Sequence, residues 1–135
     1  MTTTHPFNFD SWSTYLQQQE SKPIQWGKGH DHLEHPLYDA KIFDLIKAFE
    51  QSDYFDQNFA RTLMQKGFSE QISEADIREI INETTDFFTL RAITSLIIYN
   101  ERHIEGLWAA MIENGLLNRL LVKLNTQTPD GYPIW

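Results

Sequence analysis

Three of the five histidines stand close together in one short segment, which makes it the part of the chain richest in groups that could do chemistry. His30, His32 and His35 are interleaved there with Asp31 and Glu34. Imidazole nitrogens and carboxylate oxygens are ligands that zinc and related ions prefer. The spacing therefore raises the hypothesis of a metal site, in which Glu34 or Asp31 could act as an auxiliary base.

The pattern His-x-His-x-acid-His resembles the metal-ligand segment of the metallo-β-lactamase superfamily, in which such residues collect two zinc ions. That fold needs a large β-sandwich and further ligands far downstream, whereas this chain has 135 residues and offers only His103 later on. Three interpretations stay open: a solvated loop, a structural or adventitious zinc or nickel site, and a catalytic metal. The solvated loop is the simplest.

A second set of charged residues lies in the last third of the chain, where Arg91 and Arg102 precede Glu105 and Glu113. Pairs of Arg and Glu could tie neighbouring helices together where they are half buried. A catalytic pair is the alternative, but an Arg beside a carboxylate lowers its pKa, whereas acid/base work needs that pKa raised. Gly106, which would cost about 1 kcal/mol relative to Ala inside a helix, indicates close packing at this place.

Motifs of other enzyme classes are missing from the sequence. The chain has no cysteine, and it contains no Gly-x-Ser-x-Gly elbow, no Walker loop and no dinucleotide-binding glycine pattern. Thiolate chemistry, covalent hydrolysis by such a serine, and nucleotide binding therefore have no support in the sequence.

Acidic residues exceed basic ones by 19 to 11, which gives a net charge of −8. The excess is concentrated around a single base, Arg78. Such a surface repels nucleic acid and anionic lipid, because phosphate binding needs Lys and Arg. We expect either a solvated acidic helix or a docking face for a basic partner; the residues concerned are Glu70, Glu74, Asp76, Glu79, Glu83 and Asp86.

Hydrophobic periodicity predicts helices along most of the chain and no alternating strand pattern. No repeat or linker divides the sequence, so we expect a single domain over residues 1–135, with a core at 10–125 and terminal extensions at 1–9 and 126–135. Residues 22–36 are predicted to form a loop with a short extended piece at 22–26. In the first two thirds, a short helix capped by Asp10 and Ser11 should run to about Gln19. A second helix is expected from Asp39 to about Ser52, with its apolar face formed by Ile42, Phe43, Leu45, Ile46 and Phe49. A third should contain Phe59, Leu63 and Met64 and stop at Gly67, and a fourth should follow a capping box of Ser73 and Asp76.

The last third carries the most continuous apolar stripes. One helix is expected from Thr85 or Asp86 to Asn100, a second with a stripe from Ile104 to Ile112, and a third from Leu116 to Leu124. The short link at Asn114-Gly115 favours a helical hairpin. The predicted fold class is therefore all-α: a single-domain bundle of about six or seven short helices that ends in a helical hairpin.

Several motifs resemble the bacterial domain of unknown function 6508 family over about residues 24 to 125. The resemblance is carried by Thr89-Leu90-Arg91, Arg102-x-x-Glu105-Gly106 and Glu113-x-Gly115, and upstream by Trp26-Gly27, Pro36-Leu37-Tyr38 and Tyr54-Phe55-Asp56. The family often has Cys and His where this chain has Ile104 and Leu107, so any Cys/His chemistry would be missing here. The resemblance implies a fold and a structural motif, made of Arg91, Arg102, Glu105, Gly106, Glu113 and Gly115, but no reaction.

The last residues are too apolar for a floating terminus. Pro129-Asp130-Gly131 predicts a turn, after which Tyr132, Ile134 and Trp135 should dock either on the same domain or on a partner or second subunit.

These observations favour a non-catalytic, acidic protein-binding module, such as a small inhibitor of the immunity, antitoxin or anti-defence type that acts on a basic or nucleic-acid-handling protein. We expect it to be cytoplasmic, to need no cofactor and to bind neither nucleic acid nor membrane, and it could form a homodimer. The expected partner-binding residues are the five acidic positions Glu70, Glu74, Asp76, Glu79 and Glu83 with Tyr132 and Trp135. The alternative is a small zinc-dependent enzyme that uses His30, His32 and His35.

Overall fold

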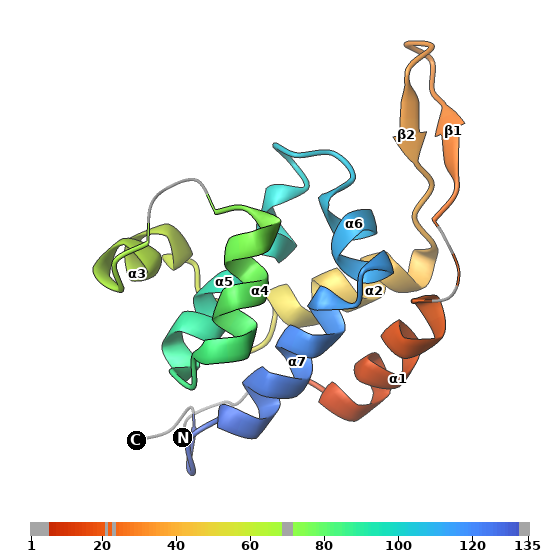
Figure 1. The fold of residues 1–135 in the computed structure, drawn as a ribbon. Coiled ribbons are helices and arrows are strands. Elements are labelled where there is room, and N and C mark those ends of the chain that lie inside the picture. The colour runs from red at the N-terminus through yellow and green to blue at the C-terminus, as the bar shows by residue number, and fades with distance from the viewer. Residues whose placement is uncertain (1–5, 21, 23, 69–71, 133–135) are drawn as a thin grey trace.

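The computed structural model describes residues 6–20, 22, 24–68 and 72–132. This part of the chain forms seven helices and one two-stranded hairpin (Figure 1), which confirms the predicted helical fold class. The elements are α1 (Phe9–Gln19), β1 (Trp26–Lys28), β2 (Glu34–Pro36), α2 (Ala40–Glu50), α3 (Phe59–Gln65), α4 (Glu74–Glu83), α5 (Phe87–Asn100), α6 (Leu107–Glu113) and α7 (Leu116–Gln127).

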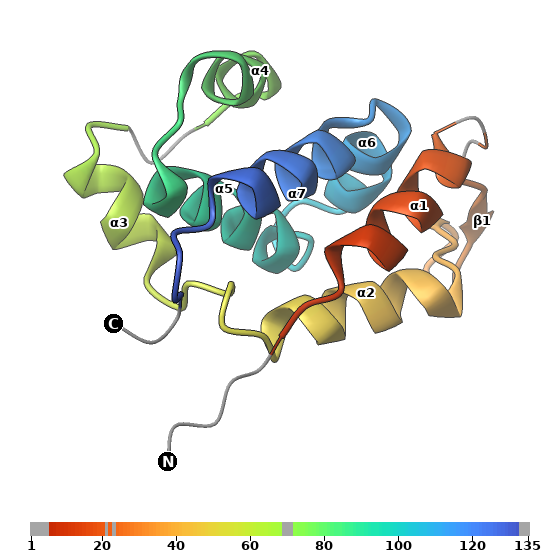
Figure 2. The same cartoon turned by 90° about the horizontal axis from the view of Figure 1, so that it is seen from below.

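α5 and α7 lie in the middle of the bundle, with α3 and α4 toward one side and α1 and α2 toward the other (Figures 1 and 2). Both central helices bury long aliphatic side chains, because their apolar residues recur at helical spacing. The largest fully buried side chains on these helices include Leu90, Ile93, Ile97, Ile98, Leu116, Leu117 and Leu120. The core therefore lies where the sequence has its most continuous apolar stripes.

The predicted capping box before α4 is confirmed. Ser73 Oγ accepts a hydrogen bond from the backbone N–H of Asp76 at 3.1 Å, and the Asp76 carboxylate accepts one from the N–H of Ser73 at 2.9 Å. This pair satisfies two backbone donors at the helix start and fixes where α4 begins. The start of α1 differs from the prediction, because Asn8 caps this helix by accepting from the N–H of Ser11.

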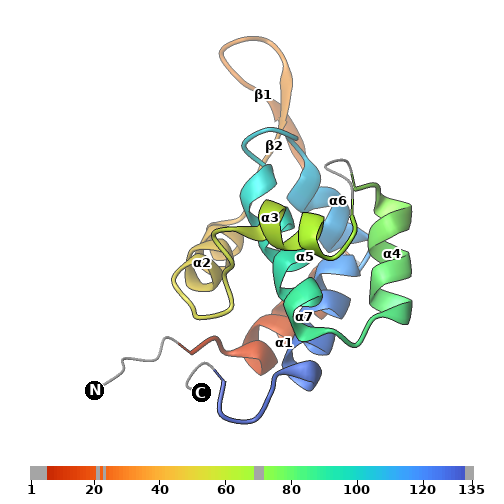
Figure 3. The ribbon, with the colours of Figure 1, turned by 90° about the vertical axis from the view of Figure 1, so that its left-hand side faces the viewer.

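Residues 22–36 are not the loop that the sequence predicts. β1 and β2 pair antiparallel, with Trp26 opposite Pro36, Gly27 opposite His35 and Lys28 opposite Glu34. The hairpin projects away from the helices at one end of the bundle (Figures 1 and 3). Strands of three residues are too short to show a period of two, and none of these six residues is fully buried, so hydrophobicity gives no signal.

Two apolar residues assigned to buried stripes are exposed. Phe43 is 51 % exposed, because it lies beside the buried face of α2 and not on it. Ile104 is 53 % exposed, because α6 begins only at Leu107 and residues 101–106 form turns. Gly106 ends these turns in a left-handed conformation, with a φ of 88°, that a helix cannot contain. In the described residues no helix is long and apolar enough to cross a membrane.

Candidate functional site

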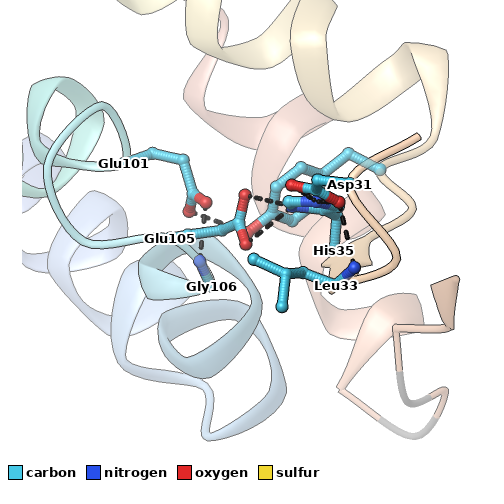
Figure 4. Close-up of polar contacts among 7 residues, drawn as sticks. Asp31, Leu33, His35, Glu101, Glu105 and Gly106 are labelled. Atoms are coloured by element: carbon cyan, nitrogen blue, oxygen red, sulfur yellow. Dashed lines mark hydrogen bonds and ion pairs between the residues drawn. The ribbon is translucent and has the colours of Figure 1, made fainter. Parts of the chain in front are cut away.

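His35 joins the hairpin to the loop between α5 and α6 (Figure 4). Its Nδ1 lies 2.8 Å from Glu105 Oε2, and its Nε2 lies 2.9 Å from Asp31 Oδ1. An imidazole with both ring nitrogens facing carboxylates donates two hydrogen bonds only when it is protonated. The hydrogen bonds to Asp31 and then to Glu105 accordingly raise the pKa of His35. We call His35, Asp31 and Glu105 the His35 clamp.

The carboxylate of Glu101 organises the loop on which the clamp closes. Its Oε2 accepts the N–H of Gly106 at 2.6 Å, and its Oε1 accepts the N–H of Trp108 at 2.8 Å and the hydroxyl of Tyr38 at 2.7 Å. Burial, together with the hydrogen bond to Glu101, raises the pKa of Tyr38, so the phenol stays neutral. Glu101 therefore holds the start of α6 and the segment that leads from the hairpin to α2.

Gly106 is required here for two independent reasons. Its φ of 88° is one that L side chains rarely adopt. A Cβ at this position would also lie 2.8 Å from the indole of Trp26. The second half of the motif, Arg102-x-x-Glu105-Gly106, thus packs against the hairpin through adjacent residues, because Gly106 receives Trp26 while Glu105 binds His35.

The Glu113-x-Gly115 motif contacts the segment between α1 and β1. Glu113 accepts a hydrogen bond from the backbone N–H of Ile24 at 2.6 Å. Gly115 has a φ of 77°, and a Cβ there would lie 3.0 Å from the carboxylate of Glu20. The motif residues after α5 therefore hold N-terminal segments against the C-terminal half of the molecule.

Arg91 lies among the residues of a different loop. Its Nη2 donates to the carbonyl of Phe55 at 3.0 Å, and its Nη1 lies 4.0 Å from the Asp56 carboxylate. Asp56 is 7 % exposed and accepts from Thr62 Oγ1 at 2.7 Å, while its own N–H donates to Ser95 Oγ at 2.8 Å. We call Arg91, Asp56, Thr62 and Ser95 the Arg91 cluster.

The expected pairing of Arg91 and Arg102 with Glu105 and Glu113 is therefore wrong. Arg91 binds Asp56, the guanidinium of Arg102 lies 4.9 Å from the ring centroid of Tyr99, and the two glutamates bind His35 and the backbone of Ile24. Three of these four residues, Arg91, Glu105 and Glu113, make long-range contacts, but spacing along the chain assigned the wrong partners to them.

The three predicted metal ligands, His30, His32 and His35, have different surroundings in the hairpin. No group of three or more His, Asp or Glu residues in the described part of the chain has the geometry to hold a metal ion. His30 and His32 lie in the exposed turn of the hairpin, where His32 has a φ of 62°, while both ring nitrogens of His35 bind carboxylates. The carboxylates around this imidazole thus serve as hydrogen-bond acceptors.

The acidic residues of α4 divide into two groups. Glu74 binds within the fold, since its Oε1 accepts from the amide of Asn114 and lies 3.5 Å from Arg78. Asp76, Glu79 and Glu83 follow one another along the exposed side of the helix, and no described Lys or Arg forms an ion pair with them. Glu70, also predicted to bind a partner, lies outside the described residues.

These three carboxylates border a hollow of about 280 Å³. Its apolar part comes from Phe68 and from Ile80, which is 5 % exposed. The hydrogen bonds from the backbone and hydroxyl of Ser73 lower the pKa of Asp76, so this carboxylate stays ionised. We call this hollow the acidic groove; it is lined by Phe68, Asp76, Glu79, Ile80, Glu83 and Thr84.

The tail folds back onto its own chain as far as the structure describes it. The predicted turn is present, with Gly131 at a φ of 82° and the N–H of Tyr132 bonded to the carbonyl of Pro129. The Tyr132 ring packs against Phe87 at a centroid distance of 4.7 Å, and its hydroxyl donates to the carbonyl of Asp53. Docking on the same chain is thus confirmed for Tyr132, whereas Ile134 and Trp135 lie outside the described residues.

Two carboxylates with several hydrogen-bond partners, Glu101 and Asp56, were not predicted as site residues. Glu101 stands next to the recognised Arg102, and Asp56 ends the recognised Tyr54-Phe55-Asp56 segment. A carboxylate that is withdrawn from water needs partners, and for each of these two residues one partner comes from a distant segment: Tyr38 for Glu101 and Arg91 for Asp56. The presence of these carboxylates in or beside the motifs was the only available indication.

Fold and contacts together define a small, mostly helical domain with a projecting hairpin, in which the motif residues hold distant segments together. A family model described as a family of unknown function (DUF6508) matches residues 10–130, so the chain belongs to this family. Searches of curated proteins and of solved structures found no match. The resemblance inferred from the motifs is confirmed, and it extends beyond the span that they indicated.

Proposed function

We propose that the protein is a non-catalytic binding module. Its acidic groove on α4 binds a basic side chain of a partner protein. The observation that carries this proposal is the combination of an apolar floor with three carboxylates that form no ion pair with a Lys or Arg in the described part of the chain. Arg and Lys side chains match such a surface, because they bury an apolar stem while the charged head stays at the rim.

The charges of the groove support a basic partner over an acidic one. Asp76, Glu79 and Glu83 place three negative charges within two turns of one helix, on a chain whose net charge is −8. Charge of one sign on a surface steers oppositely charged proteins toward it and raises the association rate. Proteins that handle nucleic acid carry such basic surfaces. The proposed role is therefore inhibition of such a protein by covering its basic surface.

A site-specific photocrosslink tests the proposal. A photoreactive residue in place of Ala75, an exposed position of α4, should capture a protein with a basic surface in cells that produce this chain. The matched control carries the same residue in place of Glu50, which is exposed on α2. Capture from position 75 that disappears in the Glu79→Gln, Glu83→Gln variant supports the proposal. Equal capture from both positions, or capture from neither, contradicts it.

The inhibitory role has its own readout. The captured partner, once purified, should lose its binding to nucleic acid when this chain is added, and it should regain that binding when the Glu79→Gln, Glu83→Gln variant replaces the unaltered chain. A partner that binds nucleic acid equally well with and without the chain would contradict inhibition and leave a binding module without it.

A further inference from the structure

A second hollow, opposite in character to the acidic groove, lies where the segment between α2 and α3 meets α5. Its volume is about 470 Å³, compared with about 280 Å³ for the acidic groove. Sites for small molecules commonly measure about 300–1,000 Å³. We call it the Tyr99 cavity; it is lined by the aromatic residues Phe55, Phe59 and Tyr99 and by Gln57, Asn58 and Arg61.

Aromatic and cationic groups converge on the ring of Tyr99. Phe59 packs against it at a centroid distance of 5.6 Å, and the ring of His103 lies 5.9 Å away. The guanidinium of Arg102 lies 4.9 Å from the Tyr99 centroid, a cation–π distance. One wall of the cavity therefore offers an aromatic surface with a positive charge beside it.

Arg61 and Arg102 form no ion pair within the described residues, unlike Arg78 and Arg91. Asp56, the carboxylate in the same loop as the cavity, is buried and accepts hydrogen bonds from Thr62 and from the N–H of Asn58. It is therefore directed into the fold and not toward Arg61. Arg61 lines the cavity, and the guanidinium of Arg102 lies on the ring of Tyr99, which lines it too. Two positive charges on or beside the lining, on a chain of net charge −8, give this place a charge opposite to that of the molecule.

We propose that the Tyr99 cavity binds a small organic anion that carries a planar ring. The ring lies against the aromatic wall, the anionic group meets Arg61 and Arg102, and the amides of Gln57 and Asn58 supply further hydrogen bonds. Guanidinium groups bind carboxylate and phosphate oxygens through paired hydrogen bonds. This site goes beyond the proposed function, because it uses other helices and a ligand of opposite charge.

Nuclear magnetic resonance of the full ¹⁵N-labelled chain tests the site with four probes. Adenosine monophosphate and benzoate each combine a ring with an anion, whereas adenosine has only the ring and inorganic phosphate only the anion. We expect saturable shifts of the amides at residues 55–61 and 99–103 with at least one of the combined probes, and binding at least about tenfold weaker for adenosine and for phosphate, since each lacks one set of contacts. Whichever combined probe binds identifies the source of the anion as phosphate or carboxylate.

Two variants locate the anion. Arg61→Gln and Arg102→Gln should each weaken binding of the combined probe about tenfold, because a hydrogen bond to a charged group is lost. Both side chains are exposed, so neither change should unfold the chain. Arg78→Gln removes the same charge from α4 and should leave the affinity unchanged. The proposal is overturned if neither combined probe shifts these amides, if phosphate or adenosine alone binds as tightly, or if Arg61→Gln and Arg102→Gln bind as the unaltered chain does.

Discussion

The Arg91 cluster and the His35 clamp both join segments that are far apart in the sequence, but they differ in their exposure to water. The Asp56 side chain is 9 % exposed and that of Arg91 23 %, whereas Asp31 and Glu105 in the clamp are 49 % and 50 % exposed. Solvent weakens exposed ion pairs, while loss of one partner leaves a buried charge without compensation. The Arg91 cluster should therefore maintain the fold, and the clamp should control how firmly the hairpin is held.

The largest effect is expected where burial is greatest. Asp56→Ala leaves Thr62 and the N–H of Asn58 without their acceptor and removes the carboxylate that faces Arg91, so the free energy of unfolding should fall by about 3 kcal/mol. The matched control is Asp44→Ala, an exposed position on α2, which should change it by less than about 0.5 kcal/mol. Urea denaturation measures both. Similar values for the two variants would show that the buried cluster has no special role.

A smaller effect on the free energy of unfolding is expected at Glu101, the half-buried carboxylate that directly follows α5. Glu101→Gln keeps the shape but replaces one acceptor oxygen by an amide, so one of the donors Gly106, Trp108 and Tyr38 loses its partner. We expect a loss of about 1–2 kcal/mol in urea denaturation. Glu105→Gln, which changes the exposed neighbour in the same loop, should destabilise less. The reverse order would mean that the clamp, and not Glu101, holds this loop.

Gly106→Ala separates backbone strain from contact with the hairpin. An Ala at positive φ costs about 1 kcal/mol, and the new Cβ would also displace the indole of Trp26. Gly67→Ala is the matched control, because Gly67 has a similar φ of 92° but nothing within 4 Å of the added Cβ. The difference between the two losses of stability measures the Trp26 contact. Equal losses, with an unchanged indole resonance of Trp26, would show that the hairpin does not rest on Gly106.

The smallest effect on stability, and the clearest dependence on pH, is expected at the clamp. The pKa of His35 is raised above its ordinary 6.5, and the pKa of Asp31 is lowered below its ordinary 3.8, chiefly by their mutual hydrogen bond. The contribution of His35 to the free energy of unfolding is complete below pH 6.5 and is lost as the pH rises through the pKa of His35 in the folded state. The contribution of Asp31 is complete above pH 3.8 and is lost as the pH falls through the pKa of Asp31 in the folded state. The clamp is therefore strongest between these two values.

A titration of the His35 imidazole by nuclear magnetic resonance checks this pH dependence. The midpoint should lie above 6.5 and should fall in Glu105→Gln, because one of the two carboxylates is neutralised. Glu34→Gln changes the carboxylate next to His35 in the sequence and should leave the midpoint where it is. A midpoint at or below 6.5 in the unaltered chain would show that the carboxylates do not hold the imidazolium in solution.

The helices could be predicted from the sequence because each buries a stripe of apolar side chains at helical spacing. α5 is predicted almost to the residue, α7 is predicted at its start but ends three residues after the expected Leu124, and α4 is marked by its capping box. The hairpin escaped prediction because it is short and exposed, so no hydrophobic pattern records it. Ile104 was misassigned because apolar character alone does not reveal that the chain must turn at Gly106.

The candidate sites were predictable only as far as residue types. Acidic character marked α4, but which carboxylates bind within the fold depends on more than Arg78, one turn away from Glu74, because the fold also brings Asn114 to Glu74. The histidine spacing singled out His35 as a metal ligand, but it could not show that the ring binds Glu105, which lies 70 residues away. The Tyr99 cavity was not predicted at all, since Arg61 and Tyr99 come from different helices.

The most direct test of the central claim, that the acidic groove and not the overall negative charge binds a basic partner, is calorimetry with a short arginine-rich peptide. Glu79→Gln with Glu83→Gln removes two carboxylates from the groove, and Asp44→Asn with Glu50→Gln removes two from the exposed side of α2. The groove variant should bind about tenfold more weakly, which corresponds to about 1.4 kcal/mol, and the α2 variant should bind as the unaltered chain does. Equal weakening by both variants would contradict the claim.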